Sequence, residues 1–235
     1  MRLLVLSGGF GTRLKTTVAD VPKALAPVGE EPFLQLQLVH WLAQGQFEFT
    51  FLLHHQADQI IAFLNSHRVG ILKNCHIDWL IEPMPMDTGG AIAHAVREMD
   101  LTGDFLITNA DTWLGGGVQE LIQASSPTIA VLELADVSRY GQVLFDQDAH
   151  VTSFSEKNSQ SESGWINAGL CHLNAGLFKD WDGNPFSLER KLFVELVKNR
   201  SLSAIPLKTD FIDIGVPDDY HRFCRWIEAD RQVPL

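Results

Sequence analysis

Short apolar runs alternate with amphipathic stretches through the first half of the chain. The apolar runs are typical of short strands and the amphipathic stretches of helices. The predicted strands cover residues 3–6, 49–53, 77–81 and 105–107, and the predicted helices cover residues 33–43, 57–64 and 91–99. Strand followed by helix, repeated, predicts right-handed βαβ units in a doubly wound, mostly parallel, Rossmann-like α/β sheet flanked by helices. Ligands are then expected beyond the carboxyl ends of its strands.

The pattern changes after about residue 127. Strand-like stretches now follow one another with turns between them, which predicts a smaller mixed or antiparallel part. These stretches cover residues 128–134, 142–145, 151–154 and 166–173, before a helix at 188–199, a short strand at 211–214 and a last helix at 217–229. The chain shows no repeat and no Pro/Gly/Ser-rich linker. We therefore expect a single domain over residues 1–235, with halves at 1–126 and 127–235.

Composition and charge narrow the classes of protein. The chain has 235 residues, 46% hydrophobic and 20% charged, which is ordinary for a globular protein. Its 18 Lys and Arg against 29 Asp and Glu give a net charge of −11, which argues against a general nucleic-acid or membrane-surface binder. The three cysteines form no CxxC pair, so a disulfide framework is not expected. With no apolar run of roughly 20 residues, we expect a cytoplasmic protein without a membrane span.

The first predicted strand runs into a glycine-rich segment, Ser7-Gly8-Gly9-Phe10-Gly11-Thr12-Arg13-Leu14. Glycines lack a Cβ, so backbone N–H groups can come close to a bound phosphate or nucleobase. A dinucleotide-binding G-x-G-x-x-G would need glycine at Leu14, and the chain has no Gly-Lys pair for a Walker A loop. A tight strand-to-helix turn would also explain the glycines, but it would not explain Arg13 or the later Lys23.

Lys23 lies between Pro22 and Pro27. Because proline fixes its own φ angle, the two prolines stiffen this segment and limit where the Lys23 amine can point. The glycine segment followed by Pro22-Lys23 resembles the signature of the sugar-1-phosphate nucleotidyltransferases, which make nucleoside-diphosphate sugars. The resemblance extends from residue 2 to about residue 226. It implies that Arg13 and Lys23, together with Asp111, are catalytic.

Two further blocks resemble the nucleotide-binding side of the family. Residues 82–90 resemble its nucleobase segment, and Asn109-Ala110-Asp111 resembles its metal-binding segment, although the family commonly has glycine where Ala110 stands. The resemblance implies that the nucleotide is bound by Leu6, Ser7, Gly8, Gly9, Gly11, Thr12, Arg13, Glu82, Thr88, Gly89, Gly90 and Asn109.

The second half carries blocks that resemble the family's sugar-phosphate site, namely Arg139-Tyr140-Gly141, Phe154-Ser155-Glu156-Lys157 and Trp165-Ile166-Asn167-Ala168-Gly169. The resemblance implies that Lys157 binds the sugar phosphate, that Glu156 and Asn167 bind sugar hydroxyls, and that Gly141 and Gly169 admit the ring. Asp213 resembles the second metal ligand, so Asp111 and Asp213 are expected to bind Mg²⁺. Structural alternatives remain: helix caps for the two aspartates, a surface pair for Glu156 and Lys157, and a turn contact for Asn167.

The blocks are closest to short family members that join GTP to D-glycero-D-manno-heptose 1-phosphate, releasing pyrophosphate, for surface polysaccharides such as capsule or lipopolysaccharide. Mannose-1-phosphate guanylyltransferases and short uridylyltransferases for glucose or N-acetylmuramate 1-phosphate remain alternatives. No C-terminal β-helix is expected, and a homodimer is one alternative for the assembly. A non-catalytic sugar-nucleotide sensor is a further alternative. A glycosyltransferase is disfavoured because Asp111-Thr112-Trp113 lacks the second carboxylate of an Asp-x-Asp motif.

The proposed reaction brings two anions together, which favours a site that supplies cations. A phosphate oxygen is already ionised at neutral pH, so the attack needs no general base. Catalysis is then expected from positioning and charge stabilisation by groups such as Arg13, Lys23 and Lys157. The lack of a histidine at a recognisable catalytic spacing agrees with this expectation.

Overall fold

A computed structural model describes residues 1–155 and 163–229 of the chain. The chain forms two compact units, each gathered from separate segments. The N-terminal unit consists of Arg2–Pro85, Thr108–Gly115 and Asp210–Leu235, and the central unit consists of Met1, Met86–Ile107 and Gly116–Thr209. The predicted halves at 1–126 and 127–235 are consecutive in sequence, whereas Thr108–Gly115 and Asp210–Leu235 both return to the N-terminal unit.

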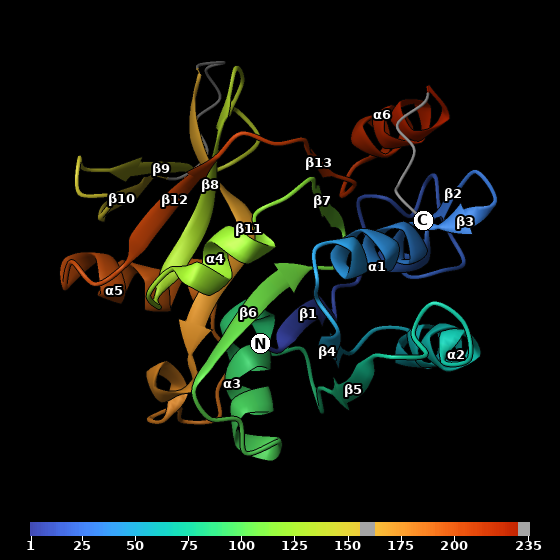
Figure 1. The fold of residues 1–235 in the computed structure, drawn as a ribbon, viewed down its shortest axis with the longest axis horizontal. Helices are drawn as coiled ribbons and strands as arrows, with labels where there is room; N and C mark the ends of the chain where they lie inside the picture. The colour runs from blue at the N-terminus through green and yellow to red at the C-terminus, as the bar shows by residue number, and fades with distance from the viewer. Residues whose placement is uncertain (156–162, 230–235) are drawn as a thin grey trace. The chain divides into compact units, whose positions relative to one another are not determined.

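Parallel strands form the centre of the N-terminal unit, as the alternation of strands and helices predicts. Strand β1 (Leu3–Ser7) pairs in parallel with β4 (Glu48–Leu53), and β4 pairs in parallel with β5 (His76–Ile81). The intervening helices are α1 (Phe33–Ala43) and α2 (Ala57–His67), drawn in blue and teal in Figure 1. Five residues of β4 are buried, which is expected for a parallel strand covered on both faces. The predicted parallel α/β core is confirmed.

Helix α1 has the bounds that its hydrophobic spacing predicts. Its buried residues recur at helical spacing along one face, so that this face packs into the core. They are Phe33, Leu34, Gln37, Leu38 and Trp41. Pro32 precedes the helix in an extended conformation, where its missing N–H costs no intrahelical hydrogen bond.

A second core in the N-terminal unit joins segments from both ends of the chain. It includes the antiparallel pair β7 (Thr112–Leu114) and β13 (Phe211–Asp213), the hairpin β2 (Pro27–Val28) and β3 (Glu31–Pro32), and the final helix α6 (Pro217–Glu228). Its buried members are Leu14, Ala26, Val28, Phe33, Trp113, Ile212, Ile214, Tyr220 and Phe223. This core therefore anchors the segment after Arg13, the segment after Lys23 and the segment around Asp213 in one unit.

The central unit has the mixed pairing that the second half of the sequence predicts. Strand β11 (Gly164–Asn174) pairs antiparallel with β6 (Asp104–Asn109), β8 (Thr128–Leu134) and β9 (Gln142–Phe145). Strand β10 (Val151–Ser155) pairs antiparallel with β9, and β12 (Ser203–Leu207) pairs in parallel with β8. The helical elements of this unit are α3 (Asp87–Glu98), α4 (Val118–Gln123), η2 (Ala175–Phe178), η3 (Leu188–Phe193) and α5 (Val194–Lys198).

Several boundaries differ from the sequence prediction. Helix α3 begins at Asp87, whereas the prediction placed its start at residue 91. The prediction left out the first turn because Gly89 and Gly90, which lie there, are weak helix formers. The single helix predicted at 188–199 is a π-helical segment, η3, followed by α5. Strands β7 and β12 and helix α4 were not predicted, because elements this short carry little periodicity.

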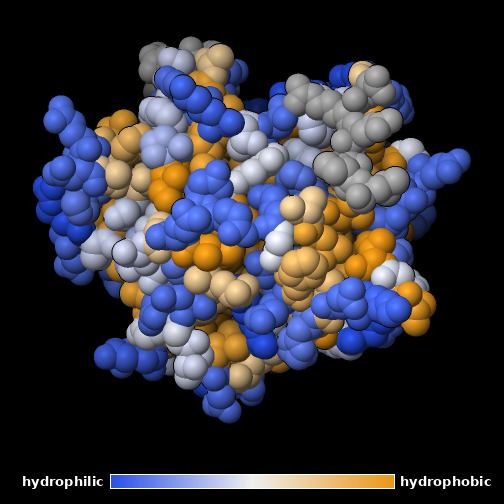
Figure 2. Space-filling model, in the orientation of Figure 1, coloured by the Kyte–Doolittle hydropathy of each residue, from blue (hydrophilic) through white to orange (hydrophobic). Residues whose placement is uncertain are grey.

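Exposed large apolar side chains are few among the described residues, and they include Phe10, Ile81, Met84 and Leu144. On the face drawn in Figure 2, apolar areas are interspersed with hydrophilic ones. None of the helices in the described residues combines the length and the apolar character needed to cross a bilayer.

Candidate active site

Lys23 and Asp111 form an ion pair in the N-terminal unit. Lys23 opens the short helix η1 (Lys23–Leu25) directly after Pro22, and Asp111 lies between β6 and β7. The distance from Lys23 Nζ to Asp111 Oδ2 is 2.8 Å, with side-chain exposures of 18% and 30%. The pair is thus sheltered but still accessible to solvent.

Asp213 joins this pair from the end of strand β13. It pairs with Thr112 of β7, and the Ile214 N–H donates a hydrogen bond of 2.9 Å to the Asp111 carbonyl. Burial raises the pKa of Asp213, and the nearby Asp111 carboxylate raises it further. A hydrogen bond from the Gly215 N–H, and then Lys23 and Arg13, oppose this rise in pKa. The predicted metal ligand Asp213 therefore interacts electrostatically with the other predicted metal ligand, Asp111. It also interacts with the predicted catalytic residues Lys23 and Arg13.

Helix capping does not account for either aspartate. Gly117 caps α4, the next α-helix after Asp111, and Val216 caps α6 after Asp213. Asp213 Oδ1 instead accepts a hydrogen bond of 2.7 Å from the Gly215 N–H, which closes a local turn. The capping alternative is thus wrong for both residues.

The glycine loop approaches these side chains closely. Gly11 has φ of +62°, and a Cβ placed on it would lie 3.0 Å from Lys23 Cγ. A Cβ on Gly8 would lie 2.6 Å from Glu82 Oε1. Larger residues at these two positions would therefore displace Lys23 or the buried Glu82, whereas a Cβ on Gly9 would meet no heavy atom within 4 Å.

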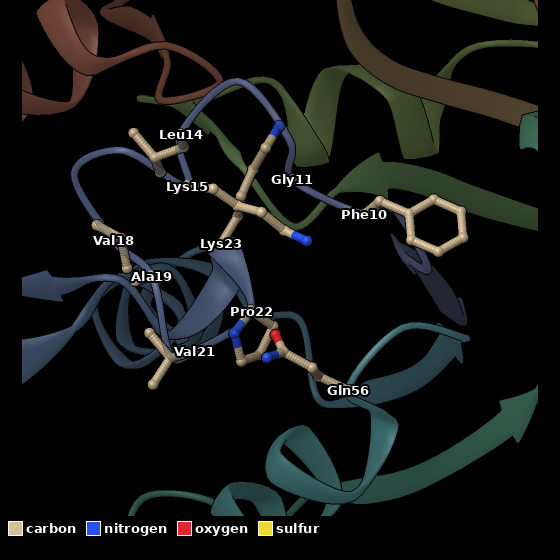
Figure 3. Close-up of a pocket in the computed structure, with 11 residues that line it drawn as sticks. Phe10, Gly11, Leu14, Lys15, Val18, Ala19, Val21, Pro22, Lys23 and Gln56 are labelled. Atoms are coloured by element: carbon tan, nitrogen blue, oxygen red, sulfur yellow. The ribbon is translucent and has the colours of Figure 1, made fainter.

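Two neighbouring hollows share Lys23. One is lined by Leu6, Ser7, Gly9, Pro22, Lys23, Ala24, Ala110 and Asp111. The other includes Gly9, Phe10, Gly11, Lys15, Lys23 and Gln56, and Figure 3 shows Lys15 and Lys23 among the side chains that line it. The predicted nucleotide-binding residues Leu6, Ser7, Gly9 and Gly11 thus line hollows beside the charged cluster. Sequence reasoning missed Lys15, which follows the recognised motif by one residue.

Gln37 is a second residue that the sequence reasoning missed. It is buried within α1, and its Nε2 donates a hydrogen bond of 2.8 Å to the Thr112 carbonyl. It therefore ties α1 to the residue after Asp111. The available signal was a polar side chain on an otherwise apolar helix face.

In the central unit, the predicted nucleobase segment packs against its own chain. The Gly89 and Gly90 N–H groups donate hydrogen bonds of 2.9 and 3.1 Å to the Phe186 carbonyl. A Cβ on Gly89 would clash with the Phe186 ring. The ring that packs on this glycine is therefore the side chain of Phe186, whereas the prediction placed a nucleobase ring on this segment. Thr88 Oγ1 accepts a hydrogen bond of 2.9 Å from the Leu188 N–H. The nucleotide-binding role of Thr88, Gly89 and Gly90 stays a prediction.

Asn167 lies on β11 and makes two hydrogen bonds. Its Oδ1 accepts from the Gly169 N–H at 3.1 Å, as the turn alternative supposes, and its Nδ2 donates to Glu189 Oε1 at 2.8 Å. Glu189 was not among the predicted residues. Gly141 directly precedes β9, and Glu156 and Lys157 lie outside the described residues.

The donor set fits a divalent cation. Carboxylate oxygens are preferred ligands of Mg²⁺, and Asp111 and Asp213 supply them. The raised pKa of Asp213 reflects burial and a neighbouring like charge, and a bound cation would favour its ionised form. Lys23 already provides one positive charge beside Asp111.

The model of a family described as nucleotidyl transferase matches residues 2–229. The chain is 32% identical to D-glycero-alpha-D-manno-heptose 1-phosphate guanylyltransferase of Campylobacter jejuni, over 95% of this chain and 98% of the relative. It is 28% identical to the mannose-1-phosphate guanylyltransferase catalytic subunit beta of Drosophila melanogaster, over 98% of this chain but only 64% of that protein.

Solved structures of nucleotidyltransferases share the fold of this chain. The chain is similar to HddC from Yersinia pseudotuberculosis complexed with GMP-PN, with 32% identity and a TM-score of 0.82, covering 96% of this chain and 99% of that one. A glucose-1-phosphate thymidylyltransferase from Bacillus anthracis, described as putative, shares the fold at 15% identity and a TM-score of 0.82, covering 99% and 97% of the two chains.

Proposed function

Because the chain belongs to the nucleotidyl transferase family, we propose that it condenses GTP with a sugar 1-phosphate to give a nucleoside-diphosphate sugar and pyrophosphate. The expected sugar is D-glycero-D-manno-heptose 1-phosphate. The observation that carries this proposal is the cluster of Lys23, Asp111, Asp213 and Arg13 beside the glycine loop. The choice of GTP is supported by the full-length heptose 1-phosphate guanylyltransferase relative and by the related HddC complex with GMP-PN.

In the proposed reaction, an oxygen of the sugar phosphate attacks the α-phosphorus of GTP. A new phosphorus–oxygen bond forms there, the bond between the α-phosphorus and the bridging oxygen to the β-phosphorus breaks, and pyrophosphate leaves with that electron pair. The attacking oxygen is already ionised near neutral pH, so no side chain has to remove a proton. The protein's task is therefore to position two anions and to stabilise the charge on the transferring group.

The positive side chains suit this task. Lys23 lies beside the glycine loop and is expected to bind at the α-phosphate, while Arg13 and the loop amides bind the β- and γ-phosphates. Mg²⁺ bound by Asp111 and Asp213 would add charge neutralisation at the reacting phosphates. Lys157 is expected to bind the sugar phosphate, and Glu156 and Asn167 the sugar hydroxyls.

The proposed setting follows from the substrates. We expect the enzyme to act in the cytoplasm, where nucleoside triphosphates are available, and to supply an activated sugar for surface polysaccharide synthesis. With a formal charge of −11 over the whole chain, small anionic substrates need local positive charge, which Lys23 and Arg13 would supply.

A mannose-1-phosphate guanylyltransferase is the second candidate, supported by the relatives with that name. A panel of the four nucleoside triphosphates with heptose, mannose, glucose and N-acetylmuramate 1-phosphates, scored for pyrophosphate, tests both candidates. We expect the greatest turnover with GTP and heptose 1-phosphate. Greatest turnover with mannose 1-phosphate would favour the second candidate, and no pyrophosphate with any pair would favour a non-catalytic binding protein.

A further inference from the structure

Glu189 lies beside the predicted sugar-binding residue Asn167, although no motif in the sequence singles it out. Asn167 Nδ2 donates a hydrogen bond of 2.8 Å to Glu189 Oε1, and Glu189 is exposed. Asn167 is half-buried on β11, whereas Glu189 reaches the surface, so an amide and a carboxylate meet at a solvent-accessible position. Together they offer both hydrogen-bond donors and acceptors to a polar ligand.

A bulge in strand β11 sets the orientation of the Asn167 side chain. In the pairing with β8, Asn167 faces Val131 and Cys171 faces Ile129, so β11 contains extra residues between these two points. Gly169 within this bulge has φ of +79°, and its N–H donates to Asn167 Oδ1. Bulges of this kind re-aim side chains and are common next to active sites. Here the bulge fixes Oδ1 and leaves the Nδ2 group directed to Glu189.

The backbone around Glu189 is also held in place. The Leu188 N–H donates to Thr88 Oγ1 at 2.9 Å, and the Arg190 N–H donates to Ser187 Oγ at 3.3 Å. Just before them, the Phe186 carbonyl accepts the hydrogen bonds from the first turn of α3. The backbone on either side of Glu189 is thus held by the chain itself, and the hydrogen bond from Asn167 orients its carboxylate, which lowers the entropic cost of ordering it around a ligand.

On the basis of the proposed function, we propose that Glu189 and Asn167 together bind neighbouring hydroxyl groups of the sugar 1-phosphate, and that Glu189 determines which sugars are accepted. An ionised carboxylate offers about four acceptor positions, and the bond from Asn167 uses one. Hydroxyl donors can take others, in charge-assisted hydrogen bonds. The remaining Nδ2 hydrogen of Asn167 can donate to a hydroxyl oxygen.

The sign of the charge decides which end of the sugar Glu189 contacts. A carboxylate repels a phosphate at close range, so Glu189 fits the uncharged hydroxyl end of the substrate and not its phosphate. A site built to hydrogen-bond a hydroxyl also rejects analogues that lack it, because its polar groups are then left unpaired. Glu189 therefore acts as a specificity-determining residue.

The first test compares the full-length protein with its Glu189→Gln and Glu189→Ala variants. Binding of sugar 1-phosphates is measured by calorimetry, and KM is measured for each substrate. We expect sugar 1-phosphate affinity to fall by about 10- to 100-fold in Glu189→Ala, with the KM for GTP changed by less than about twofold. Glu195→Gln on α5 is the matched control, because Glu195 is also exposed, and it should leave both values unchanged.

The second test uses deoxy sugar 1-phosphates, each lacking one hydroxyl. The wild type should bind at least one of them more weakly than the parent sugar, and Glu189→Ala should lose that discrimination. Unchanged sugar affinity in Glu189→Ala, or equal losses for the parent sugar, the deoxy sugars and GTP, would overturn the assignment. A wild type that binds sugar 1-phosphates with help from Glu189 but releases no pyrophosphate would instead contradict the proposed function.

Discussion

Lys23 and Asp111 are 88 residues apart in the sequence, yet their side chains form an ion pair of 2.8 Å. Gly11 packs against the Lys23 side chain, and Asp213 interacts electrostatically with both members of the pair. A sheltered lysine beside two carboxylates is a preorganised cation, and the reaction proposed for this protein requires such cations.

Replacing Lys23 should impair turnover more than it impairs folding. We expect Lys23→Ala to lower kcat by about 10²- to 10³-fold, by analogy with the loss of one preorganised transition-state donor. Steady-state kinetics measure this effect, and circular dichroism checks the fold. Lys73→Ala is the control, since Lys73 is exposed on a turn after α2. Near-normal kcat in Lys23→Ala would remove Lys23 from the catalytic residues.

Replacing both predicted metal ligands should abolish metal-dependent turnover. In Asp111→Asn with Asp213→Asn, we expect activity to fall by at least about 10²-fold and added Mg²⁺ not to restore it. Titration of activity with Mg²⁺ measures this dependence in the wild type and the variant. A double variant that is fully active and still needs Mg²⁺ would show that the metal binds elsewhere.

The contribution of Asp213 to the free energy of unfolding should fall as pH rises. Its pKa is raised by burial and by Asp111, so the folded state binds more protons than the unfolded state above about pH 4. The free energy of unfolding contributed by Asp213 therefore falls as pH rises toward its raised pKa. We expect Asp213→Asn to be at least as stable as the wild type at pH 7 without added metal, as judged by urea unfolding. Marked destabilisation of Asp213→Asn at pH 7 would contradict this account.

Gly11 and Gly9 should respond differently to the same substitution. Gly11→Ala places a Cβ at positive φ and 3.0 Å from Lys23 Cγ, so we expect a loss of about 1–2 kcal/mol in unfolding free energy. Gly9→Ala meets no heavy atom within 4 Å and should leave stability nearly unchanged. Chemical denaturation compares the two variants, and equal losses would show that local crowding at Gly11 is not the cause.

His40 should make stability depend on pH below neutrality. Burial lowers its pKa, although its hydrogen bond to the Leu114 carbonyl opposes this shift, and its ring stacks on Trp113 with centroids 4.5 Å apart. The unfolded state therefore binds more protons as pH falls below about 6.5, and stability is lost down to the lowered pKa. In His40→Gln, melting temperatures measured from pH 7 to pH 5 should show a shallower decrease. An unchanged slope would contradict a lowered pKa at His40.

The sequence predicted the parallel core because its strands are apolar on both faces, as in β4, and because helical segments such as α1 separate them along the chain. The resemblance to the family implied that Lys23, Asp111 and Asp213 act together, and the three side chains do interact in the structure. The sequence could not predict the interleaving of the two units, which depends on the late return of residues 210–229 to the N-terminal unit.

Other residues were missed because their roles depend on contacts far apart in sequence. Glu189 meets Asn167 only through the bulge in β11, and Gln37 reaches the residue after Asp111 only through the packing of α1. The close packing of Phe186 on Gly89 is equally invisible in the sequence, where a glycine pair indicates close approach but not what approaches.

The cluster around Lys23 is proposed to direct a nucleotidyl group from GTP to a sugar phosphate. The most direct measurement follows two labelled forms of GTP during incubation with heptose 1-phosphate and Mg²⁺. Label from the α-phosphate should appear in the nucleoside-diphosphate sugar, and label from the γ-phosphate should appear in pyrophosphate. Label from the γ-phosphate in inorganic phosphate or in the sugar, with no α-label in a sugar nucleotide, would contradict the claim.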